Sequence, residues 1–293
     1  MTKTALLINT KSRRGRDMLK NLSRVLEDEG IEVTDTFEIN KKNDIDTVLR
    51  KIRRYNPQLL IACGGDGTIN RTIEYLQDTK MRLAIIPAGT TNNLARSLNL
   101  PLDVRGSVAV IKKNHARAID IGIMNGAVVS NVMGVGVSAY IAKNVTSSLK
   151  KYFGRLAYGI TGIGQLFRHR AFEAKIYDVD KEFEAHVRSH QLIIANGRFH
   201  AGKEIITTNS LDNGQLVIFA LGGKSRLSMM YQMIRYYASS RHDYAQPSYY
   251  IGRNVIIELD RYQQVEVDGE VSRKKVIKIN AQTAKTTLKV HYA

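Results

Sequence analysis

The first hundred residues alternate between short apolar runs and segments with helical periodicity. Apolar runs at residues 4–8, 31–37, 58–63 and 82–86 predict strands. Helices are predicted over residues 16–29, 45–55, 92–98 and from the third strand to about residue 76. Strands that alternate with helices indicate a parallel sheet with helices on both faces, whose ligands bind at the carboxyl ends of the strands.

The sequence pattern changes after residues 119–122, where short segments rich in β-branched residues follow one another. Turn signals such as Asp212-Asn213-Gly214 and Asp268-Gly269 separate them, which favours antiparallel pairing. The strands expected here cover residues 187–195, 215–221, 254–259, 264–267, 276–279 and 287–292. We therefore predict an α/β domain over residues 1–122 and a β domain over residues 123–293, and leave open whether the last strand packs back on the first domain.

The chain is strongly basic, with 44 Lys and Arg against 27 Asp and Glu and a net charge of +17. This charge favours a polyanionic partner, which could be nucleic acid, an anionic membrane or a phosphorylated ligand. The alternative is that the charge only keeps the protein soluble. No helix-turn-helix, zinc-finger or RNA-binding signature is present, so nucleic acid is not expected. No apolar run approaches the roughly 20 residues of a membrane span, and residues 5–8 are too short for a signal peptide, which predicts a cytoplasmic protein.

A glycine-rich turn joins the strand at 58–63 to the helix that follows it: Gly64-Gly65-Asp66-Gly67-Thr68. Glycines let a backbone approach a phosphate, and the N-terminus of the next helix offers unpaired N–H groups to the anion. Asp66 beside a polyphosphate would need a bridging cation, which suggests Mg²⁺, and Thr68 could cap the helix or bind a phosphate oxygen. The alternative is an ordinary tight turn.

A second turn of small residues follows the next strand, at residues 87–96, and also opens a helix. It contains Gly89, Thr90 and Asn92. Because the carboxyl ends of adjacent parallel strands meet at one edge of a sheet, both turns should face the same crevice. The pair favours a phosphate site over an ordinary turn.

Together these residues resemble the diacylglycerol-kinase-like lipid kinases of bacteria, which are related to eukaryotic diacylglycerol, sphingosine and ceramide kinases. The matching elements come in the family's order and span most of the chain. They are residues 64–68, 87–96, 120–122, 154–158, 196–197, 212–214 and 267–270.

The resemblance implies a phosphofructokinase-like N-terminal domain, a C-terminal β-sandwich, and a cleft between them where ATP and substrate meet. It implies transfer of the γ-phosphate of ATP to a lipid hydroxyl, most directly that of diacylglycerol to give phosphatidic acid, with ATP and Mg²⁺ as cofactors. The ATP-binding residues that it implies are Asn9, Thr10, Ser12, Gly64, Gly65, Asp66, Gly67, Thr68, Asn70, Gly89, Thr90 and Asn92. Thr10 stands where the family usually has proline.

Glu270 matches the family position assigned as general base, and Asp66 is the other catalytic candidate. A carboxylate that accepts the proton of an alcohol helps that alcohol to attack a phosphoryl group. Without the resemblance, Glu270 after Asp268-Gly269 reads as a solvated turn residue.

Two positions depart from the family pattern, and both replace aspartate by asparagine. Asn93 follows Asn92 in the second turn and removes a charge from the expected substrate side. Asn213 stands in the element that binds a structural Mg²⁺ in the family, and Asp212 could compensate by a small shift in register. Asp212 and Asn213 are therefore the expected metal ligands, with a weakened hold on Mg²⁺.

Residues 143–175 mix seven basic residues and one acid with aromatic and aliphatic side chains. This composition suits docking on an anionic lipid surface, or else it belongs to a helix with an ordinary core face. We expect a cytoplasmic enzyme that associates peripherally with membranes and leave a homodimer open. The alternative functions are an NAD kinase, which shares the first glycine-rich turn but has a different second motif, and a non-catalytic basic protein that binds nucleotides or nucleic acid.

Overall fold

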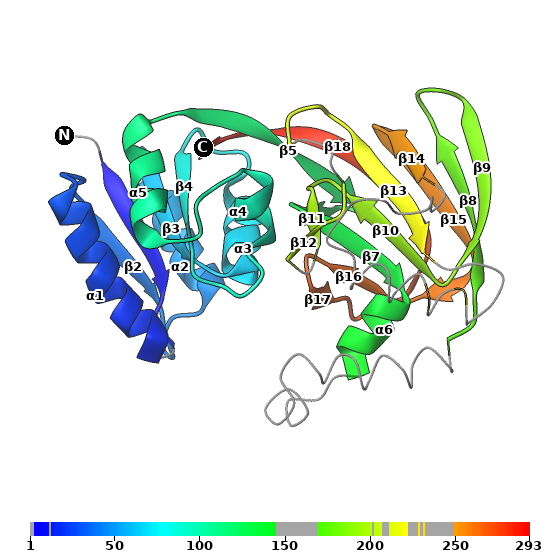
Figure 1. Ribbon diagram of the computed structural model, residues 1–293, viewed down its shortest axis with the longest axis horizontal. Coiled ribbons are helices and arrows are strands. Elements are labelled where there is room, and N and C mark those ends of the chain that lie inside the picture. The colour runs from blue at the N-terminus through cyan, green and yellow to red at the C-terminus, as the bar shows by residue number, and fades with distance from the viewer. Residues whose placement is uncertain are drawn as a thin grey trace.

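The computed structural model describes residues 3–11, 13–144, 169–200, 202–206, 211–221, 228, 231 and 249–293. The chain forms an α/β lobe and a β lobe (Figure 1). Two long strands, β5 (Ala116–Met124) and β18 (Val276–His291), run between the lobes. The predicted fold class, an α/β domain followed by an antiparallel β-sandwich, is confirmed.

The α/β lobe is built on a parallel sheet. Its elements are β1 (Thr4–Asn9), α1 (Arg13–Asp28), β2 (Asp35–Ile39), α2 (Ile45–Tyr55), β3 (Leu59–Gly64), α3 (Asp66–Leu76), β4 (Arg82–Pro87), α4 (Asn93–Ser97) and α5 (Val104–Lys113). The strands lie in the order β2-β1-β3-β4. β1 and β3 are almost wholly apolar because both sheet faces are covered: one apolar cluster includes residues of α1 and α5, the other residues of α2, α3 and α4.

Helix α5 is absent from the sequence prediction. Gly106 and several β-branched valines weaken its intrinsic helix propensity. Its ends nevertheless carry helix signals, since the Asp103 side chain accepts from the Gly106 N–H and Asn114 adopts the left-handed conformation that ends helices. Packing of Val108 and Ile111 against the sheet then stabilises the helix.

The β lobe is a sandwich of two mostly antiparallel sheets. Its further elements are β6 (Ala127–Val129), β7 (Val132–Gly136), α6 (Val137–Asn144), β8 (Phe172–Asp178), β9 (Phe183–Ser189), β10 (Gln191–Ala195), β11 (Phe199–His200), β12 (Lys203–Glu204), β13 (Leu216–Leu221), β14 (Tyr249–Gly252), β15 (Asn254–Gln263), β16 (Val265–Val267) and β17 (Glu270–Val271). One sheet runs β14-β13-β10-β7-β16-β17, and β8, β9, β15 and β18 belong to the other. An apolar cluster that draws on both sheets fills the space between them.

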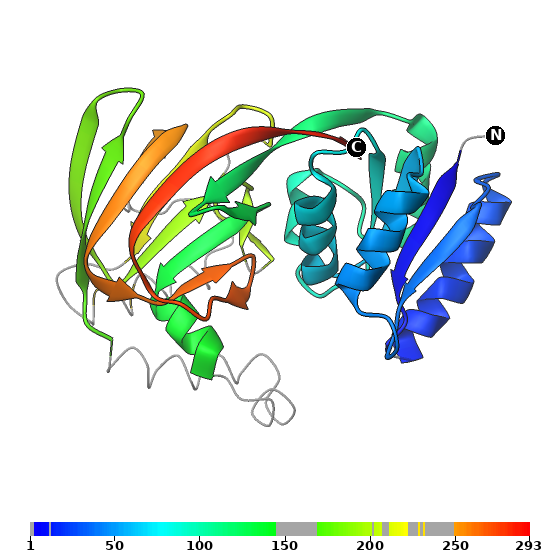
Figure 2. The same cartoon turned by 180° about the vertical axis from the view of Figure 1, so that it is seen from behind.

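Strand β18 connects the lobes and appears in red in Figure 2. It pairs antiparallel with β5 and β15, and its end pairs parallel with β4, where Lys289 lies opposite Arg82. One sheet therefore continues from the α/β lobe into the β lobe. The prediction of separate strands at 276–279 and 287–292 is wrong, because the polar residues between them remain in one long strand.

Two other sequence expectations need correction. Residues 187–195 are not one strand, because the chain breaks around His190 and continues in the other sheet as β10. The last residues of the basic segment 143–175 belong to strand β8 and not to a helix, whereas residues 145–168 lie outside the described part of the chain. In the described residues we find no helix with both the length and the apolar character of a membrane span.

Candidate functional site

The two small-residue turns predicted from the sequence lie against each other at the carboxyl edge of the parallel sheet. Gly64 and Pro87 are paired residues of β3 and β4, and the Ala88 N–H donates to the Gly64 carbonyl (2.9 Å). A Cβ placed on Gly89 would lie 2.7 Å from the Gly65 Cα. Position 89 therefore requires glycine, and a Cβ on Gly65, at 3.2 Å from the Gly89 Cα, would also press the two turns apart.

Asp66 joins the first turn to the second. Its carboxylate accepts from the Thr91 hydroxyl (2.5 Å), the Asn92 N–H (2.8 Å) and the Asn93 N–H (2.6 Å). The Asn92 amide oxygen in turn accepts from the Gly89 N–H (2.9 Å). Asp66 and Asn92 thus fix the shape of both turns.

The N-terminus of α3 presents backbone donors at this edge. The helix begins at Asp66, and Gly65 in the N-cap position provides no side-chain hydrogen bond. N–H groups in the first turn of such a helix suit an anion. The expected capping role of Thr68 is wrong, because Thr68 lies inside the first turn and its Cβ packs against Gly64.

The first nucleotide loop expected from the sequence follows β1. The Asn9 amide oxygen accepts from the Lys11 N–H (3.2 Å). Thr10 is buried, and its hydroxyl donates to the Glu38 carboxylate (2.7 Å), which ties the end of β1 to β2. Ser12 lies outside the described residues. Thr90 is exposed in the second turn.

Glu270 approaches the first turn from the other lobe. It opens β17 in a hairpin with β16, where it pairs with Val267 around a tight turn that gives Asp268 and Gly269 positive φ (49° and 89°). Its Oε1 lies 3.7 Å from the position that a Cβ on Gly67 would occupy. The side chain is exposed. The Glu270 carboxylate therefore lies at van der Waals distance from the first turn of α3.

Asp268 anchors this hairpin, a role that the sequence prediction missed. Its carboxylate accepts from the N–H groups of Ser130, Asn131 and Val132 and from the Ser130 hydroxyl, at 2.8 to 3.0 Å. Burial raises the pKa of Asp268 to about 6, although these hydrogen bonds act in the opposite direction. The Ser130 hydroxyl also lies 2.6 Å from the Asn70 amide oxygen in α3, so this group reaches the other lobe.

The short hairpin of β11 and β12 makes a second contact between the lobes. The Gly202 N–H donates to the Asn93 amide oxygen (2.8 Å), and the Arg198 N–H donates to the Ser97 hydroxyl (3.1 Å). Asn93 therefore supplies an acceptor at the position where the sequence resemblance predicts aspartate. The turn that follows β4 is held by Asp66 on one side and by this hairpin on the other.

The expected metal ligands Asp212 and Asn213 lie in the loop before β13. Asp212 forms an ion pair with Arg117 of β5, and the Asn213 amide oxygen accepts from the Gln215 N–H (3.2 Å). Within the described residues, no group of three or more His, Cys, Asp or Glu side chains is arranged to hold a metal. Asp120 of β5 also lies beside this loop, where its carboxylate accepts from the Gly214 N–H (2.6 Å).

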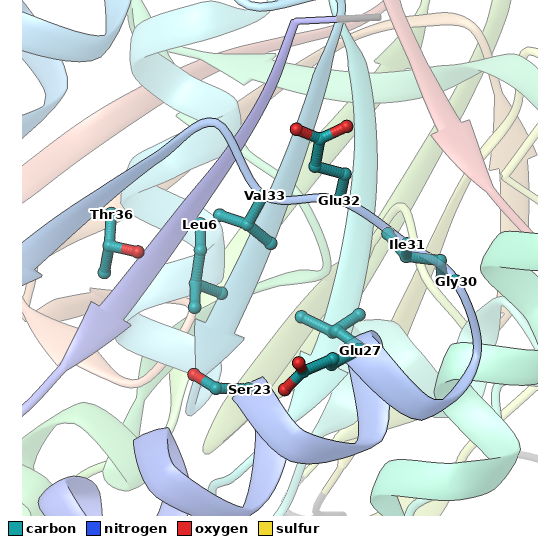
Figure 3. A pocket seen from close by; sticks show the side chains of 9 residues that line it. Leu6, Ser23, Glu27, Gly30, Ile31, Glu32, Val33 and Thr36 are labelled. Carbon is teal, nitrogen blue, oxygen red and sulfur yellow. The ribbon is translucent and has the colours of Figure 1, made fainter.

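A cavity of about 370 Å³ lies elsewhere, between the end of α1 and strands β1 and β2 (Figure 3). Leu6 and Val33 contribute apolar surface, and Glu27 and Glu32 bring negative charge. None of its lining residues was predicted to bind nucleotide. Two glutamates make this cavity unsuited to a polyphosphate.

Comparison with known proteins agrees with this geometry. Residues 3–124 match the family model described as diacylglycerol kinase catalytic domain, and residues 131–289 match the YegS C-terminal NAD kinase beta sandwich-like domain. A protein named diacylglycerol kinase from Bacillus subtilis (strain 168) is 30% identical over 280 residues, covering 92% of this chain and 90% of the relative. Its counterpart from Staphylococcus saprophyticus is 29% identical over 253 residues, covering 85% and 82%.

Solved structures share the whole fold. Two structures from Bacillus anthracis str. Sterne cover 100% of this chain and 97% of their own, with TM-scores of 0.80 and 0.74 at 22% and 19% identity. The second is described as a diacylglycerol kinase. At this level of identity the likeness concerns the fold alone.

Proposed function

Because the chain belongs to the diacylglycerol kinase catalytic domain family, we propose that it transfers the γ-phosphate of ATP to a lipid hydroxyl. Diacylglycerol is the proposed acceptor and phosphatidic acid the product, since relatives of similar length are named diacylglycerol kinases. The observation that carries the proposal is the position of Glu270, which faces Gly67 at the start of α3 from the opposite lobe.

The α/β lobe supplies the nucleotide side of the proposed reaction. ATP enters as its Mg²⁺ complex, so the cation arrives with the phosphates as part of the substrate. N–H groups at the start of α3 bind phosphate oxygens, and the close approach of Gly65 and Gly89 leaves the backbone accessible to them. Asp66 keeps the two turns in register, because both of its oxygens already accept hydrogen bonds from the second turn.

The β lobe supplies the base. As the lipid hydroxyl oxygen forms a bond to the γ-phosphorus, the bond from that phosphorus to the bridging oxygen of ADP breaks, and Glu270 accepts the hydroxyl proton. Glu270 is exposed, which suits a group that must meet an incoming substrate. Asp268 holds the hairpin that carries it.

We also propose that the β lobe meets an anionic membrane, which makes the protein a cytoplasmic enzyme with peripheral attachment. Tyr262 and Ile277 are 63% and 40% exposed, and they adjoin the paired residues Gln263 and Val276. The loop between β17 and β18 adds the exposed cations of residues 273–275. Exposed aromatic and aliphatic groups beside cations favour binding at a lipid interface.

The test is transfer of label from γ-labelled ATP in the presence of Mg²⁺. Diacylglycerol, ceramide, sphingosine and undecaprenol are offered in mixed micelles, with NAD offered in solution. Label in diacylglycerol is the expected result. Label in NAD would favour the NAD kinase alternative, and no label in any acceptor would overturn the proposed kinase activity.

A vesicle experiment tests the membrane proposal separately. Sedimentation with anionic vesicles should be stronger than with neutral vesicles and should weaken at high salt. Tyr262→Ser together with Ile277→Ser should reduce sedimentation and leave transfer to a short-chain, soluble diacylglycerol unchanged. Equal sedimentation of wild type and variant would exclude this surface.

A further inference from the structure

The loop that carries Asp212 lies beside the two strands that connect the lobes. The Leu211 carbonyl accepts from the Asp120 N–H (2.6 Å) in β5, and the Gly214 carbonyl accepts from the Thr283 hydroxyl (3.2 Å) in β18. A cleft of about 380 Å³ opens here. Its lining residues are Asp120, Asp212, Asn213, Gly214, Arg253, Asn254, Gln282, Thr283, Ala284 and Lys285.

The family resemblance implies a structural Mg²⁺ at this loop, but the donors present do not fit one. Mg²⁺ demands nearly octahedral coordination by oxygen atoms, and it is usually held by one or two carboxylates together with several waters. One carboxylate oxygen of Asp120 accepts from the Gly214 N–H (2.6 Å), and Asp212 is paired with Arg117. The amide oxygen of Asn213 carries no charge and accepts from the backbone of its own turn.

Protein cations occupy the surroundings of this loop instead. The guanidinium group of Arg117 pairs with Asp212, and its Cζ lies 4.5 Å from the ring centroid of Tyr292. The guanidinium of Arg253 lies against Gly214, since a Cβ on that glycine would be 3.0 Å from its Nη2. Lys285 pairs in register with Asp120, so both side chains project from the same face of the β5–β18 ladder.

The balance of charge therefore opposes a divalent ion. Two carboxylates, Asp120 and Asp212, are surrounded by three cations: Arg117 of β5, Arg253 between β14 and β15, and Lys285 of β18. A divalent cation placed among them would be repelled by all three. It would also have to displace Arg117 from Asp212, which breaks both the ion pair and the contact with Tyr292.

We propose that Arg117 takes the place of the structural metal in this chain, so that the joint between the lobes is held without a divalent cation. Arg117 is fixed by β5 and by Tyr292, and its guanidinium neutralises Asp212 as a metal would. Asn213 and Arg117 then act together: the loop has an uncharged amide where the resemblance predicts a carboxylate, and Arg117 places a permanent cation on Asp212. The proposal concerns stability and does not depend on the proposed kinase activity.

The test measures thermal unfolding without nucleotide, first in EDTA and then with excess MgCl₂ at constant ionic strength. The wild-type unfolding midpoint should change by less than about 1 °C, because the described residues around Asp212 form no site whose occupancy would shift it. Mn²⁺ titration followed by electron paramagnetic resonance should show no tight site. A rise of several degrees with Mg²⁺, or tight Mn²⁺ binding that Asp212→Asn removes, would overturn the proposal.

A double variant tests whether a metal can replace Arg117. Arg117→Gln with Asn213→Asp removes the guanidinium that pairs with Asp212 and adds a second carboxylate to the loop. Its unfolding midpoint in EDTA should fall by about 2–4 °C and should recover in part when Mg²⁺ is added. A folded double variant whose unfolding midpoint does not change with Mg²⁺ would also contradict the proposal.

Arg53→Gln is the matched control. Arg53 pairs with Asp78 on the surface of the α/β lobe, so the substitution also removes an arginine and frees an aspartate. The control should lose some stability and show no dependence on Mg²⁺. A response to Mg²⁺ in the control equal to that of the double variant would show that the effect is not specific to the Asp212 loop. If the double variant fails to fold, the Mn²⁺ titration of the wild type decides.

Discussion

Asp66 in the α/β lobe and Asp268 in the β lobe stabilise the two halves of the candidate site by the same kind of hydrogen bonding. Each is followed directly by a glycine and accepts hydrogen bonds from successive N–H groups of another segment. Asp66 accepts from residues 91–93, and Asp268 accepts from residues 130–132. A carboxylate suits this role because it accepts several hydrogen bonds at once, each stronger than a neutral one.

The two carboxylates differ in what they position. The partners of Asp66 belong to its own lobe, so Asp66 shapes the nucleotide side. Asp268 binds Ser130, whose hydroxyl also contacts Asn70 of the other lobe. Asp268 therefore sets the position of the Glu270 hairpin relative to α3. The nucleotide half is organised within one lobe, whereas the acceptor half is organised across both.

The largest effect is expected from Asp66→Ala. The change leaves the Thr91 hydroxyl and the N–H groups of Asn92 and Asn93 without their acceptor, at a cost of about 1.5–3 kcal/mol for each bond to a charged group. The second turn should lose its shape, and transfer to lipid should fall below detection. Initial rates with labelled ATP and circular dichroism measure activity and folding.

Asp66→Asn provides the control for charge. An amide oxygen retains one acceptor, but the NH₂ group then faces a backbone donor. Its activity should lie between those of wild type and Asp66→Ala. Full activity in either variant would show that the nucleotide turns do not need this carboxylate.

Glu270→Gln should have the next largest effect. Glutamine keeps the size of the side chain but cannot accept the proton, so turnover should fall by about 10²–10⁴-fold while ATP binding changes little. Single-turnover rates and titration with a fluorescent ATP analogue separate the two quantities. Glu258→Gln, which removes the surface partner of Lys278, is the control and should keep full activity. Full activity in Glu270→Gln would exclude the base role.

The α/β lobe could be predicted from the sequence because its signals are local. The glycine-rich turn at 64–68 follows an apolar strand and precedes a helix, and the structure places it there. Helix α2 has the predicted bounds, with Asp44 as its cap. These features depend on residues within one or two turns of one another, so composition and spacing reveal them.

The contacts that unite the site could not be predicted in this way. Asp268 and Ser130 are 138 residues apart, and Asp66 and Asn93 are 27 apart. Nothing in the spacing of an Asp-Gly dipeptide distinguishes a solvated turn from an anchor for a distant loop. Likewise, Arg117 gives no local sign that it pairs with Asp212. The sequence shows these residues, but only the folded structure shows which residues they contact.

Asp268→Asn should have a smaller effect on activity than Glu270→Gln. The amide cannot accept from all the donors around it, so one N–H loses its partner at a cost of about 1–3 kcal/mol. A displaced Glu270 should lower turnover by about ten- to a hundredfold. Denaturant unfolding and initial rates measure both effects. A variant with wild-type stability would show that the hairpin has another anchor.

The same variant tests the pKa of Asp268. In the folded protein this carboxyl keeps its proton up to a pKa of about 6, whereas an ordinary aspartate has lost it by then. Between about pH 4 and 6 the folded state therefore binds more protons, and the stability from this group falls as pH rises. The unfolding free energy of wild type minus that of Asp268→Asn should decrease as the pH rises from about 4 to 6 and should stay constant at higher pH. A constant difference would contradict the raised pKa.

The smallest effect is expected from Asn93→Asp, which restores the charge usual in the family. The amide oxygen of Asn93 already accepts from the Gly202 N–H, and a carboxylate oxygen can make the same bond. Folding stability should therefore change by less than about 1 kcal/mol, and kcat/KM for the lipid by less than about tenfold. Asn93→Ala, which loses the acceptor, should be the weaker enzyme of the two. If Asn93→Asp instead raised kcat/KM far beyond tenfold, this turn would act through charge at the acceptor side, and the link to Gly202 would not be its main role.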